Sequence, residues 1–400
     1  MRDWQELRIK DAVSLVSNKA EDLSLPYIAL DNIVSWDAQF IPSESTSDGN
    51  SNECEPGDVL FGKLRPYLAK AYIPTEKSIC SPEFMVMRPK TGTNNKFMLY
   101  YFLSKSFIGY IKNQVAGTKM PRTKWSELGN LSFKLPSLEE QEAIAAYLDK
   151  ECEKIGREIE LLERKADAYI RLRRSLINQA VTRGLNPNAS MKPSGIEWVD
   201  SIPIHWNIKR GKSIFKEVYR EVRPEDGTVT CFRDGEVTLR TNRRTTGFTE
   251  SEKEIGYHGV RIGDLVIHQM DAFAGSIGIS DSDGKCSPIC IVCRPLCEDE
   301  IDLNYYCHLL RVMAHSGFIQ ALAKGIRERT TDFRYKTLVT LNFPVPPLEE
   351  QQQIAAYLDE KCGKIDAIIG KIEAKVERLK ELKRSLINEV VTGKRAIKNL

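Results

Sequence analysis

The chain has 400 residues, of which 42% are hydrophobic and 28% are charged, and its formal net charge is +3. This composition excludes a wholly disordered chain, because the hydrophobic share is enough for one large domain or two ordinary ones. With so small a net charge, any nucleic-acid surface must come from local clusters of basic residues. No apolar run approaches the roughly 20 residues of a membrane span, and the N-terminus has no apolar signal core, so we expect a cytoplasmic protein without a membrane partner.

Residues 1–134 have the pattern of a module with mixed helices and strands. Short apolar runs bounded by glycine or proline predict strands at residues 59–61 and 84–87, and the pattern of residues 97–111 predicts a helix. Basic residues cluster in the expected loops, where lysine and arginine can neutralise phosphates and arginine can also bind guanine. The candidate DNA contacts of this module are Lys63, Arg65, Lys119, Arg122 and Lys124.

Residues 135–186 predict a long helix that begins at residue 138. Ser137 and Glu140 have the spacing of a capping box, and no proline interrupts residues 138–183. Apolar residues then recur at steps of four and three, which indicates the seam of a coiled coil. The seam positions of this helix are Ile155, Ile159, Leu162, Ala166 and Tyr169.

Residues 187–344 predict a polar linker followed by a second mixed module. The linker covers residues 187–193, strands are expected at 265–267 and 289–293, and a helix is expected at 303–323. This module also has basic and amide side chains in its loops, and asparagine can bind adenine through two hydrogen bonds. Its candidate DNA contacts are Arg240, Asn242, Arg243, Arg244, Lys324, Arg327, Arg329 and Arg334.

Residues 345–400 predict a second long helix, over residues 348–393, with two prolines leading into or occupying its first turn. The apolar series of both helices resumes three residues after the seam, at Leu172 in the first and Leu382 in the second. Such a phase slip predicts a local overwinding of the coiled coil. The seam positions of the second helix are Ile365, Ile369, Ile372, Val376 and Leu379.

An internal repeat organises the whole chain. Between residues 135–184 and 345–394, 25 of 50 positions are identical at a constant offset of 210. A weaker match at an offset of 206 relates the two modules, and Trp4 is the expected counterpart of Trp206. We therefore predict an α+β fold with a pseudo-two-fold internal repeat, in which two mixed α/β modules are joined by two long helices that form an antiparallel coiled coil.

Two patterns that suggest a metal or phosphate site are set aside. The cysteines at positions 286, 290, 293 and 297 invite a metal interpretation. In the first module, however, the counterparts of two of them are Phe84 and Met87, so these positions accept plain core residues. Gly211-Lys212-Ser213 lacks the earlier glycine of a phosphate-binding loop. Because no nuclease or methyltransferase motif is present either, we expect no catalytic residue and no metal site.

Three segments are distinctive enough to suggest a family. They are the run from Gly57 to Leu68, the Leu-Pro-x-Leu-Glu-Glu-Gln-x-x-Ile-Ala segment at 135–145, and Ser194-Gly195-Ile196-Glu197-Trp198 with the following Ile-Pro and His-Trp pairs. Together they resemble the specificity subunits of type I restriction enzymes over nearly the whole chain. The first module lacks the Ser-Gly-Ile-Glu-Trp segment and begins at Met1, so the resemblance does not define the packing of its first strand.

The resemblance implies a non-catalytic subunit that provides DNA sequence specificity. Residues 1–134 and 187–344 would be target-recognition domains, each reading one half of a split site in double-stranded DNA. Residues 135–186 and 345–400 would be conserved helical spacers that set the gap and dock two methyltransferase subunits of an adenine-specific complex. Two motor–nuclease subunits would complete the restriction enzyme. S-adenosylmethionine, ATP and magnesium would belong to these partner subunits.

Two alternatives stay open at this point. A coiled-coil scaffold that binds no DNA would show no salt-sensitive affinity for duplex DNA. A self-contained enzyme would methylate DNA without partners. The sequence does not define the target bases or the length of the gap.

Overall fold

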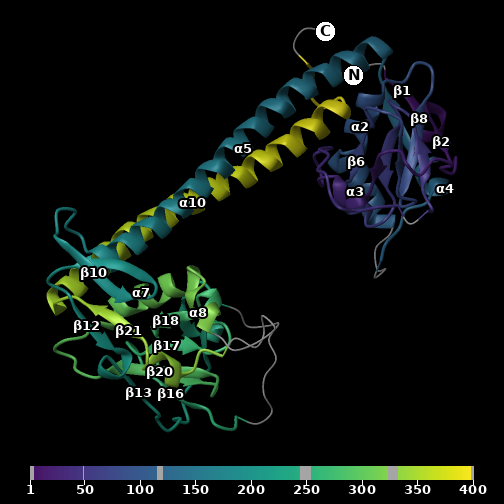
Figure 1. Ribbon diagram of the computed structural model, residues 1–400. Coiled ribbons are helices and arrows are strands. Elements are labelled where there is room, and N and C mark those ends of the chain that lie inside the picture. Colours follow the sequence, from purple (N-terminus) through teal and green to yellow (C-terminus); the bar gives the residue numbers. More distant parts are fainter. Residues whose placement is uncertain (1–3, 48, 115–119, 244–253, 323–331, 398–400) are drawn as a thin grey trace. The chain divides into compact units, whose positions relative to one another are not determined.

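The structure is a computed structural model that describes residues 4–47, 49–114, 120–243, 254–322 and 332–397. The chain divides into two compact units, Met1–Arg164 with Ile372–Leu400, and Lys165–Lys371. Each unit contains one mixed module and a segment of each long helix (Figure 1).

The first unit is built around an antiparallel sheet with strand order β2-β8-β5-β6. A smaller sheet, β3-β7-β4, and the pair β1-β9 complete its strands. The strands are β1 (Gln5–Arg8), β2 (Val13–Val16), β3 (Tyr27–Ile28), β4 (Asn52–Cys54), β5 (Val59–Gly62), β6 (Ala71–Tyr72), β7 (Ser78–Cys80), β8 (Phe84–Pro89) and β9 (Ser132–Leu135). The short helices are α1 (Ile9–Ala12), η1 (Leu30–Asn32), η2 (Pro66–Leu68), α2 (Asn95–Phe102), α3 (Lys105–Gln114) and α4 (Trp125–Leu128).

Both faces of the central sheet are buried, which explains why its strands are continuous apolar runs. Successive side chains of a strand point to opposite faces. Phe61 on β5 therefore packs with α2 and α3, where its ring centroid lies 5.8 Å from Phe102 and 5.3 Å from Phe107. Leu60 points to the other face and belongs to the core shared with Ile28 and the smaller sheet.

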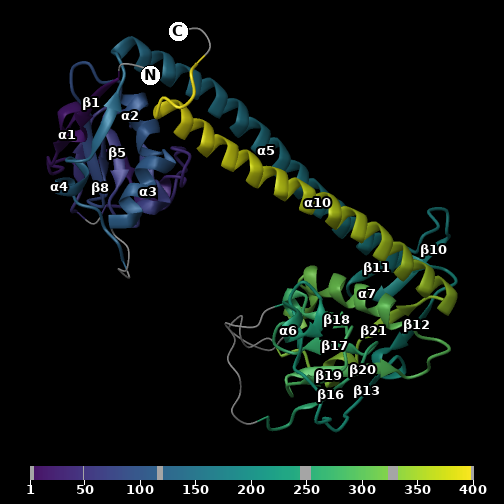
Figure 2. The same ribbon diagram turned by 180° about the vertical axis from the view of Figure 1, so that it is seen from behind.

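The second unit repeats this plan with a sheet of order β13-β20-β17-β18 (Figure 2). Its strands are β10 (Met191–Ile196), β11 (Val199–Pro203), β12 (Asn207–Arg210), β13 (Phe215–Glu217), β14 (Val229–Cys231), β15 (Val237–Leu239), β16 (His258–Val260), β17 (Leu265–His268), β18 (Ile277–Ile279), β19 (Gly284–Cys286), β20 (Cys290–Pro295) and β21 (Asn342–Val345). Its short helices are η3 (Gly211–Ser213), α6 (Arg240–Arg243), η4 (Ala272–Ala274), α7 (Leu303–His315), α8 (Phe318–Leu322) and α9 (Tyr335–Leu338).

The register of the two central sheets confirms the repeat between the modules. In the first, Val59 pairs with Met87; in the second, Leu265 pairs with Cys293. Cys290 and Cys293 are three residues apart on β20, so their side chains belong to cores on opposite faces of the sheet. This geometry prevents the two thiols from binding one metal ion.

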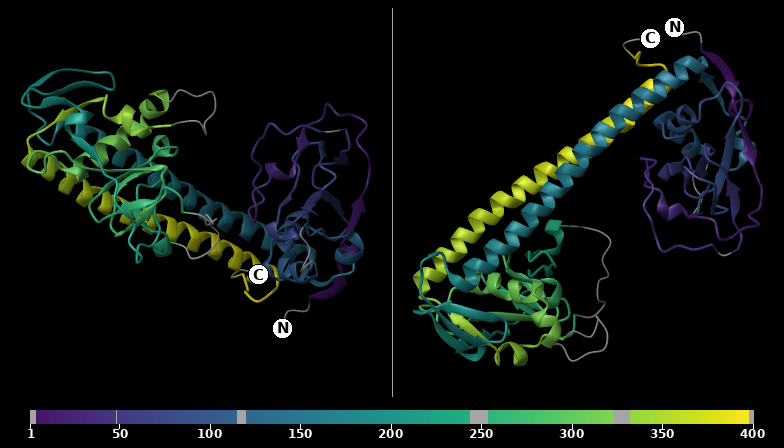
Figure 3. Two further views of the ribbon diagram at one scale, coloured as in Figure 1. Left: turned by 90° about the horizontal axis from the view of Figure 1, so that it is seen from below. Right: turned by 45° about the horizontal axis from the view of Figure 1, so that its top comes forward.

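The two long helices are α5 (Leu138–Arg183) and α10 (Leu348–Val391), and α5 has the range expected from the sequence. They lie side by side and antiparallel within each unit (Figure 3). In the first unit, Leu148 near the start of α5 shares a core with Val390 near the end of α10, and further along α5 Glu158 pairs with Lys375 at 2.7 Å.

The second unit shows the same antiparallel direction with the roles of the two helices exchanged. Val181, near the end of α5, shares a core with Ile354 and Leu358, near the start of α10. One helical turn or more from these core contacts, Arg173 of α5 forms an ion pair with Asp366 of α10. The predicted antiparallel coiled coil is therefore confirmed within each unit. All ten predicted seam residues are buried or half-buried.

The predicted phase slip after the seam is wrong. Leu172 is 46% exposed and Leu382 is 52% exposed, so neither continues the interface. The next residues, Arg173 and Lys383, take the inward positions instead. The heptad therefore runs on without interruption through one basic residue in each helix, because the flexible lysine or arginine stem can lie along an apolar seam.

Three further expectations need correction at their boundaries. The expected helix over residues 97–111 is two helices, α2 and α3, because the buried Ser104 ends the first and its hydroxyl caps the second, accepting a hydrogen bond from the backbone N–H of Phe107 at 3.3 Å. The expected helix over residues 303–323 breaks at Gly317, which has a φ of +81°. The predicted linker ends early, since β10 begins inside it.

Among the helices described, none is long and apolar enough to cross a membrane.

Candidate nucleic-acid interface

Two segments far apart in sequence lie side by side at one edge of the first module. Residues 63–65 follow β5, and residues 121–123 lead into α4. The backbone N–H of Lys63 donates to the carbonyl of Glu83 at 2.7 Å, and that of Thr123 donates to the carbonyl of Lys63 at 3.1 Å. We call these two backbone hydrogen bonds the loop frame. The loop frame brings together two basic segments that lie far apart in the sequence.

The loop frame brings four of the five predicted basic residues of this module together. Arg65 is exposed in a left-handed conformation with a φ of +48°, and its N–H donates to the carbonyl of Pro121 at 2.8 Å. Such a backbone conformation in an arginine costs free energy and is often found at functional sites. Arg122 and Lys124 are exposed beside it. The fifth candidate, Lys119, lies outside the described residues.

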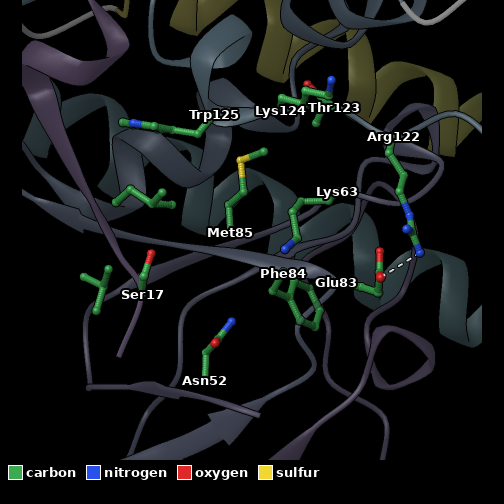
Figure 4. Close-up of a pocket in the computed structure, with 12 residues that line it drawn as sticks. Ser17, Asn52, Lys63, Glu83, Phe84, Met85, Arg122, Thr123, Lys124 and Trp125 are labelled. Carbon is green, nitrogen blue, oxygen red and sulfur yellow. Dashed lines mark hydrogen bonds and ion pairs between the residues drawn. The ribbon is translucent and has the colours of Figure 1, made fainter. Parts of the chain in front are cut away.

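A cavity of about 410 Å³ opens next to the loop frame (Figure 4). Its lining combines apolar side chains, including Phe84, Met85 and Trp125, with polar side chains from the frame. In Figure 4 the Lys63 side chain lies near the middle of the lining residues, and an ion pair joins Arg122 to Glu83 at 2.8 Å. The arrangement places hydrogen-bonding groups among apolar side chains, with the exposed basic residues Arg122 and Lys124 in the same lining.

The second module has the same loop frame with different side chains. The N–H of Gln269 donates to the carbonyl of Ile289 at 3.0 Å, and that of Phe333 donates to the carbonyl of Gln269 at 3.1 Å. The backbone bonds therefore place Gln269 at the position of Lys63. The predicted contact Arg334 occupies the N-cap position of α9, as Lys124 does in α4, and it forms an ion pair with Asp332.

Three other predicted contacts of the second module lie on α6 and have partners of their own. Arg243 pairs with Asp234 at 2.8 Å and stacks over the Phe232 ring at 4.2 Å. Asn242 donates to the hydroxyl of Thr238 at 2.8 Å. Arg240 is half-exposed at the start of this helix. The remaining four predicted contacts, which lie outside the described residues, are Arg244, Lys324, Arg327 and Arg329.

The junction between each module and the long helices involves contacts that the sequence did not predict. In the first unit, the indole N–H of Trp4 donates to Glu140 of α5 at 2.9 Å. The predicted capping box is therefore only half present, because Ser137 accepts the Glu140 N–H at 3.3 Å but the Glu140 carboxylate turns to Trp4. On the other side of the indole lies Gly393, two residues after the end of α10.

The second unit confirms that Trp4 and Trp206 are counterparts. The indole N–H of Trp206 donates to Glu350 of α10 at 3.0 Å, and His205 contacts the same carboxylate at 2.8 Å. Gly184, directly after α5, is so close to this indole that an added Cβ would lie 3.3 Å from it. Each tryptophan therefore binds the start of one long helix and the end of the other within its own unit.

The Gly-Asp pair that recurs in both modules holds a buried carboxylate. Asp58 accepts two hydrogen bonds from Arg88 at 2.8 Å, and this carboxylate raises the pKa of the Arg88 guanidinium. Asp264 is fully buried and accepts two hydrogen bonds from Arg220. The recurrence of Gly-Asp was the only sequence signal for these residues. These carboxylates each hold an arginine beside a turn, and we assign them no chemistry.

In the described part of the chain, no group of three or more histidine, cysteine, aspartate or glutamate side chains could hold a metal ion. His268 lies near Asp271, with a nitrogen–oxygen distance of 3.6 Å, and burial lowers the pKa of its imidazole. The recurring feature of the described geometry is one loop frame in two versions, each in a module attached to a long helix pair.

Comparison with known proteins agrees with a DNA-specificity protein. The type I restriction modification DNA specificity domain family matches residues 1–164 and 207–378. The chain is 23% identical over 432 residues to the MjaVIII specificity subunit of Methanocaldococcus jannaschii, with 100% of this chain and 94% of that protein covered. It is also 24% identical over 155 residues to the EcoDI specificity subunit of Escherichia coli, which covers 37% of this chain and 34% of that protein.

Solved structures show the same fold. A chain from a structure described as the basis of complex assembly and conformational transition of the type I R-M system matches with a TM-score of 0.74 at 19% identity, covering 98% of both chains. The HsdS subunit from Thermoanaerobacter tengcongensis matches with a TM-score of 0.51 at 19% identity, covering 99% of this chain and 98% of that one. The chain belongs to the type I restriction modification DNA specificity domain family, and it is a specificity subunit of such a system.

Proposed function

We propose that this chain recognises a bipartite DNA site, with one half read by each module. The proposal assigns residues 1–134 and 187–344 as the two target-recognition domains, and residues 135–186 and 345–400 as the helical spacers. The spacers set the number of base pairs between the halves. The chain itself performs no catalysis and serves an adenine-specific methyltransferase complex.

The observation that carries this proposal is the loop frame in two versions. Lys63 and Gln269 have the same backbone bonds in their modules, yet one side chain is cationic and the other neutral. A scaffold that holds the backbone constant and varies the side chains suits two readers with different targets. The exposed cations around the first frame are suited to phosphates, which position a protein on DNA without specifying sequence.

The continuity of the two long helices supports the proposed spacer role. Each of α5 and α10 runs without a break, for 46 and 44 residues. At 1.5 Å per residue, the longer one spans roughly 70 Å. A paired helix of this length resists bending far better than a loop would, so two readers attached to it would have to meet matching faces of the duplex, which turns once in about 10 base pairs.

The partners are proposed from the named relatives. Specificity subunits by name belong to type I restriction enzymes, so we propose two methyltransferase subunits and two motor–nuclease subunits as partners, with double-stranded DNA as the target. S-adenosylmethionine, ATP and magnesium are assigned to those subunits. The exposed leucines on the helix pair, such as Leu161 at 60% and Leu382 at 52% exposure, suit protein contacts.

The test uses the chain purified together with its host's methyltransferase subunits. Binding to duplex DNA should be sequence-selective and should weaken steeply with salt, since phosphate contacts release counterions. Mapping of methylated adenines in the host genome should then give a site of two defined halves around a gap of fixed length. A complex that binds no duplex DNA at any salt concentration would favour the scaffold alternative. Methylation by the isolated chain would favour a self-contained enzyme.

A further inference from the structure

The cavity beside the first loop frame contains a hydrogen-bond acceptor without a described partner. One carboxylate oxygen of Glu83, Oε1, accepts from Arg122 at 2.8 Å. The other, Oε2, is buried and has no hydrogen-bond partner among the described residues. A buried carboxylate oxygen left unpaired costs free energy, so a donor supplied from outside the module would stabilise it.

Two further side-chain groups around the same cavity could form hydrogen bonds with a ligand. The Thr123 hydroxyl is buried and unpartnered among the described residues, in a residue that is only 2% exposed. The Lys63 ammonium makes no hydrogen bond or ion pair with the other residues described, although it lies among the lining side chains (Figure 4). Lys63, Glu83 and Thr123 therefore bring a cationic donor, an anionic acceptor and a hydroxyl that can do either to a cavity whose lining also includes Ser17, Asn52 and Lys124.

These groups favour a neutral planar ligand over a phosphate. A phosphate entering the cavity would meet the Glu83 carboxylate and be repelled by it. Arg65 lies outside the lining and offers an exposed cation, and Lys124 is exposed on the lining itself. An adenine edge in the major groove presents an acceptor nitrogen beside an amino donor, and cytosine presents an amino donor. Lysine and glutamate match those groups, and the apolar walls formed by Phe84 and Trp125 suit contact with a base.

The second module lacks this set of groups at the corresponding places. Its loop frame puts Gln269 in place of Lys63 and Ile289 in place of Glu83. Asp332, one residue before Phe333, stands where Arg122 stands in the first module. The donor and acceptor pattern is therefore specific to the first module, as expected for a determinant of one half-site.

We infer that the Lys63–Glu83 cavity reads one base of the first module's half-site, and that this base carries an exocyclic amino group, as adenine and cytosine do. Glu83 accepts a hydrogen bond from that amino group. Lys63 donates to N7 if the base is adenine, or to O6 of the paired guanine if the base is cytosine. Arg122 positions Glu83, while the exposed cations at the rim bind the backbone. This inference rests on the proposed function, because it assigns the base contact within it.

The experiment replaces Glu83 by the side chain that the second module uses, in Glu83→Ile. The matched control is Glu53→Ile on β4, because the Glu53 side chain is 24% exposed against 26% for Glu83 and lies outside the cavity. A second variant, Lys63→Gln, also takes its side chain from the second module. Each full-length chain is purified with its methyltransferase partners, and its affinity is measured for duplexes changed at one base pair at a time.

We expect Glu83→Ile and Lys63→Gln to reduce discrimination roughly tenfold at one and the same position of one half-site. The other half-site and the Glu53→Ile control should be unchanged, and circular dichroism should show folded protein. Unchanged discrimination, or an equal change for every duplex, would overturn the inference. The proposed function fails separately, if the unmodified complex itself does not distinguish the duplexes.

Discussion

The two glutamines of the Leu-Glu-Glu-Gln segments show how a single polar side chain fixes a module to its helix. Gln351 is fully buried at the start of α10. Its side-chain oxygen accepts from the N–H of Asp302 at 2.9 Å, and its amide donates to the carbonyls of Glu300 at 2.9 Å and Pro346 at 2.8 Å. Gln141 makes three bonds of the same kind in the first unit. The identity of this segment in both copies thus has a structural reason.

Replacing Gln351 by alanine leaves one backbone N–H and two carbonyl groups without partners. We expect Gln351→Ala to lower the free energy of local unfolding by roughly 3 kcal/mol. Hydrogen exchange of peptides that cover the start of α7 measures the change. The exposed neighbour serves as the control, because Gln352→Ala should change the same peptides by less than about 0.5 kcal/mol. Equal effects of the two substitutions would show that burial of this amide is unimportant.

Part of the candidate interface could be predicted from the sequence, because clusters of basic residues in the expected loops indicate DNA contacts. Lys63 and Arg122 were predicted because basic side chains in loops are a direct signal. Glu83 was not, because its role depends on a backbone bond between segments that only the folded chain brings together. The internal repeat could have identified it, since the counterpart at an offset of 206 is the apolar Ile289.

At the scale of the elements, each of the two long helices has one basic residue at an inward heptad position. Lys383 of α10 is 8% exposed, and its ammonium forms an ion pair with Asp37 of the first module. Arg173 of α5 occupies the corresponding position in the second unit and pairs with Asp366. A polar residue at a seam position can specify the register of a coiled coil at some cost in stability.

Removing only Asp37 from the ion pair with Lys383 should lower the unfolding free energy of the first unit more than removing both residues. Asp37→Ala leaves the buried Lys383 ammonium unpaired, and we expect a loss of about 1 to 3 kcal/mol in the unfolding free energy of the first unit. Adding Lys383→Leu should restore most of that loss, because leucine fits a seam position. Hydrogen exchange of the last turns of α10 reports both variants. A double variant less stable than Asp37→Ala alone would contradict this explanation.

The sequence predicted the strands and long helices well where one physical signal dominated. The continuous apolar runs of β5 and β8 and the heptads of α5 and α10 are of this kind. It failed at Leu172 and Leu382, because apolar character alone favours leucine over a neighbouring lysine or arginine as the inward residue. Ion pairs such as Lys383 with Asp37 reverse that preference, and their partners cannot be known before the fold is.

For the molecule as a whole, the two units should differ in their response to acid. All five histidines lie in the second unit. Burial lowers the pKa of His258, His268 and His315 below the ordinary value of 6.5. The unfolded chain then binds protons more readily than the folded unit, so the stability that these groups contribute is present above pH 6.5 and is lost as the pH falls below it.

We therefore expect the second unit to unfold at lower temperature between pH 6.5 and 5, while the first unit changes less over the same interval. Peptide-resolved hydrogen exchange during a thermal ramp separates the two units. The variant His258→Phe should reduce the pH dependence of the second unit, because it removes one of the buried groups. An equal loss of stability in both units would contradict the assignment to histidine.

The spacer role predicts a change in geometry without a change in the bases read. Insertion of one heptad at equivalent points of α5 and α10 preserves the seam and lengthens each helix by roughly 10 Å. The gap in the methylated site should then increase by about three base pairs, while both half-sites stay the same. Sequencing of methylated adenines in cells that carry the variant measures both quantities. A new half-site with an unchanged gap would contradict the spacer role.

The central claim, that each module reads its own half of a split site, is tested most directly by exchanging one module. Residues 1–134 are replaced by the corresponding module of another family member, and the methylated adenines of the host genome are mapped before and after. The account predicts that one half-site changes while the other half-site and the gap are retained. A change in both half-sites, or in neither, would contradict it.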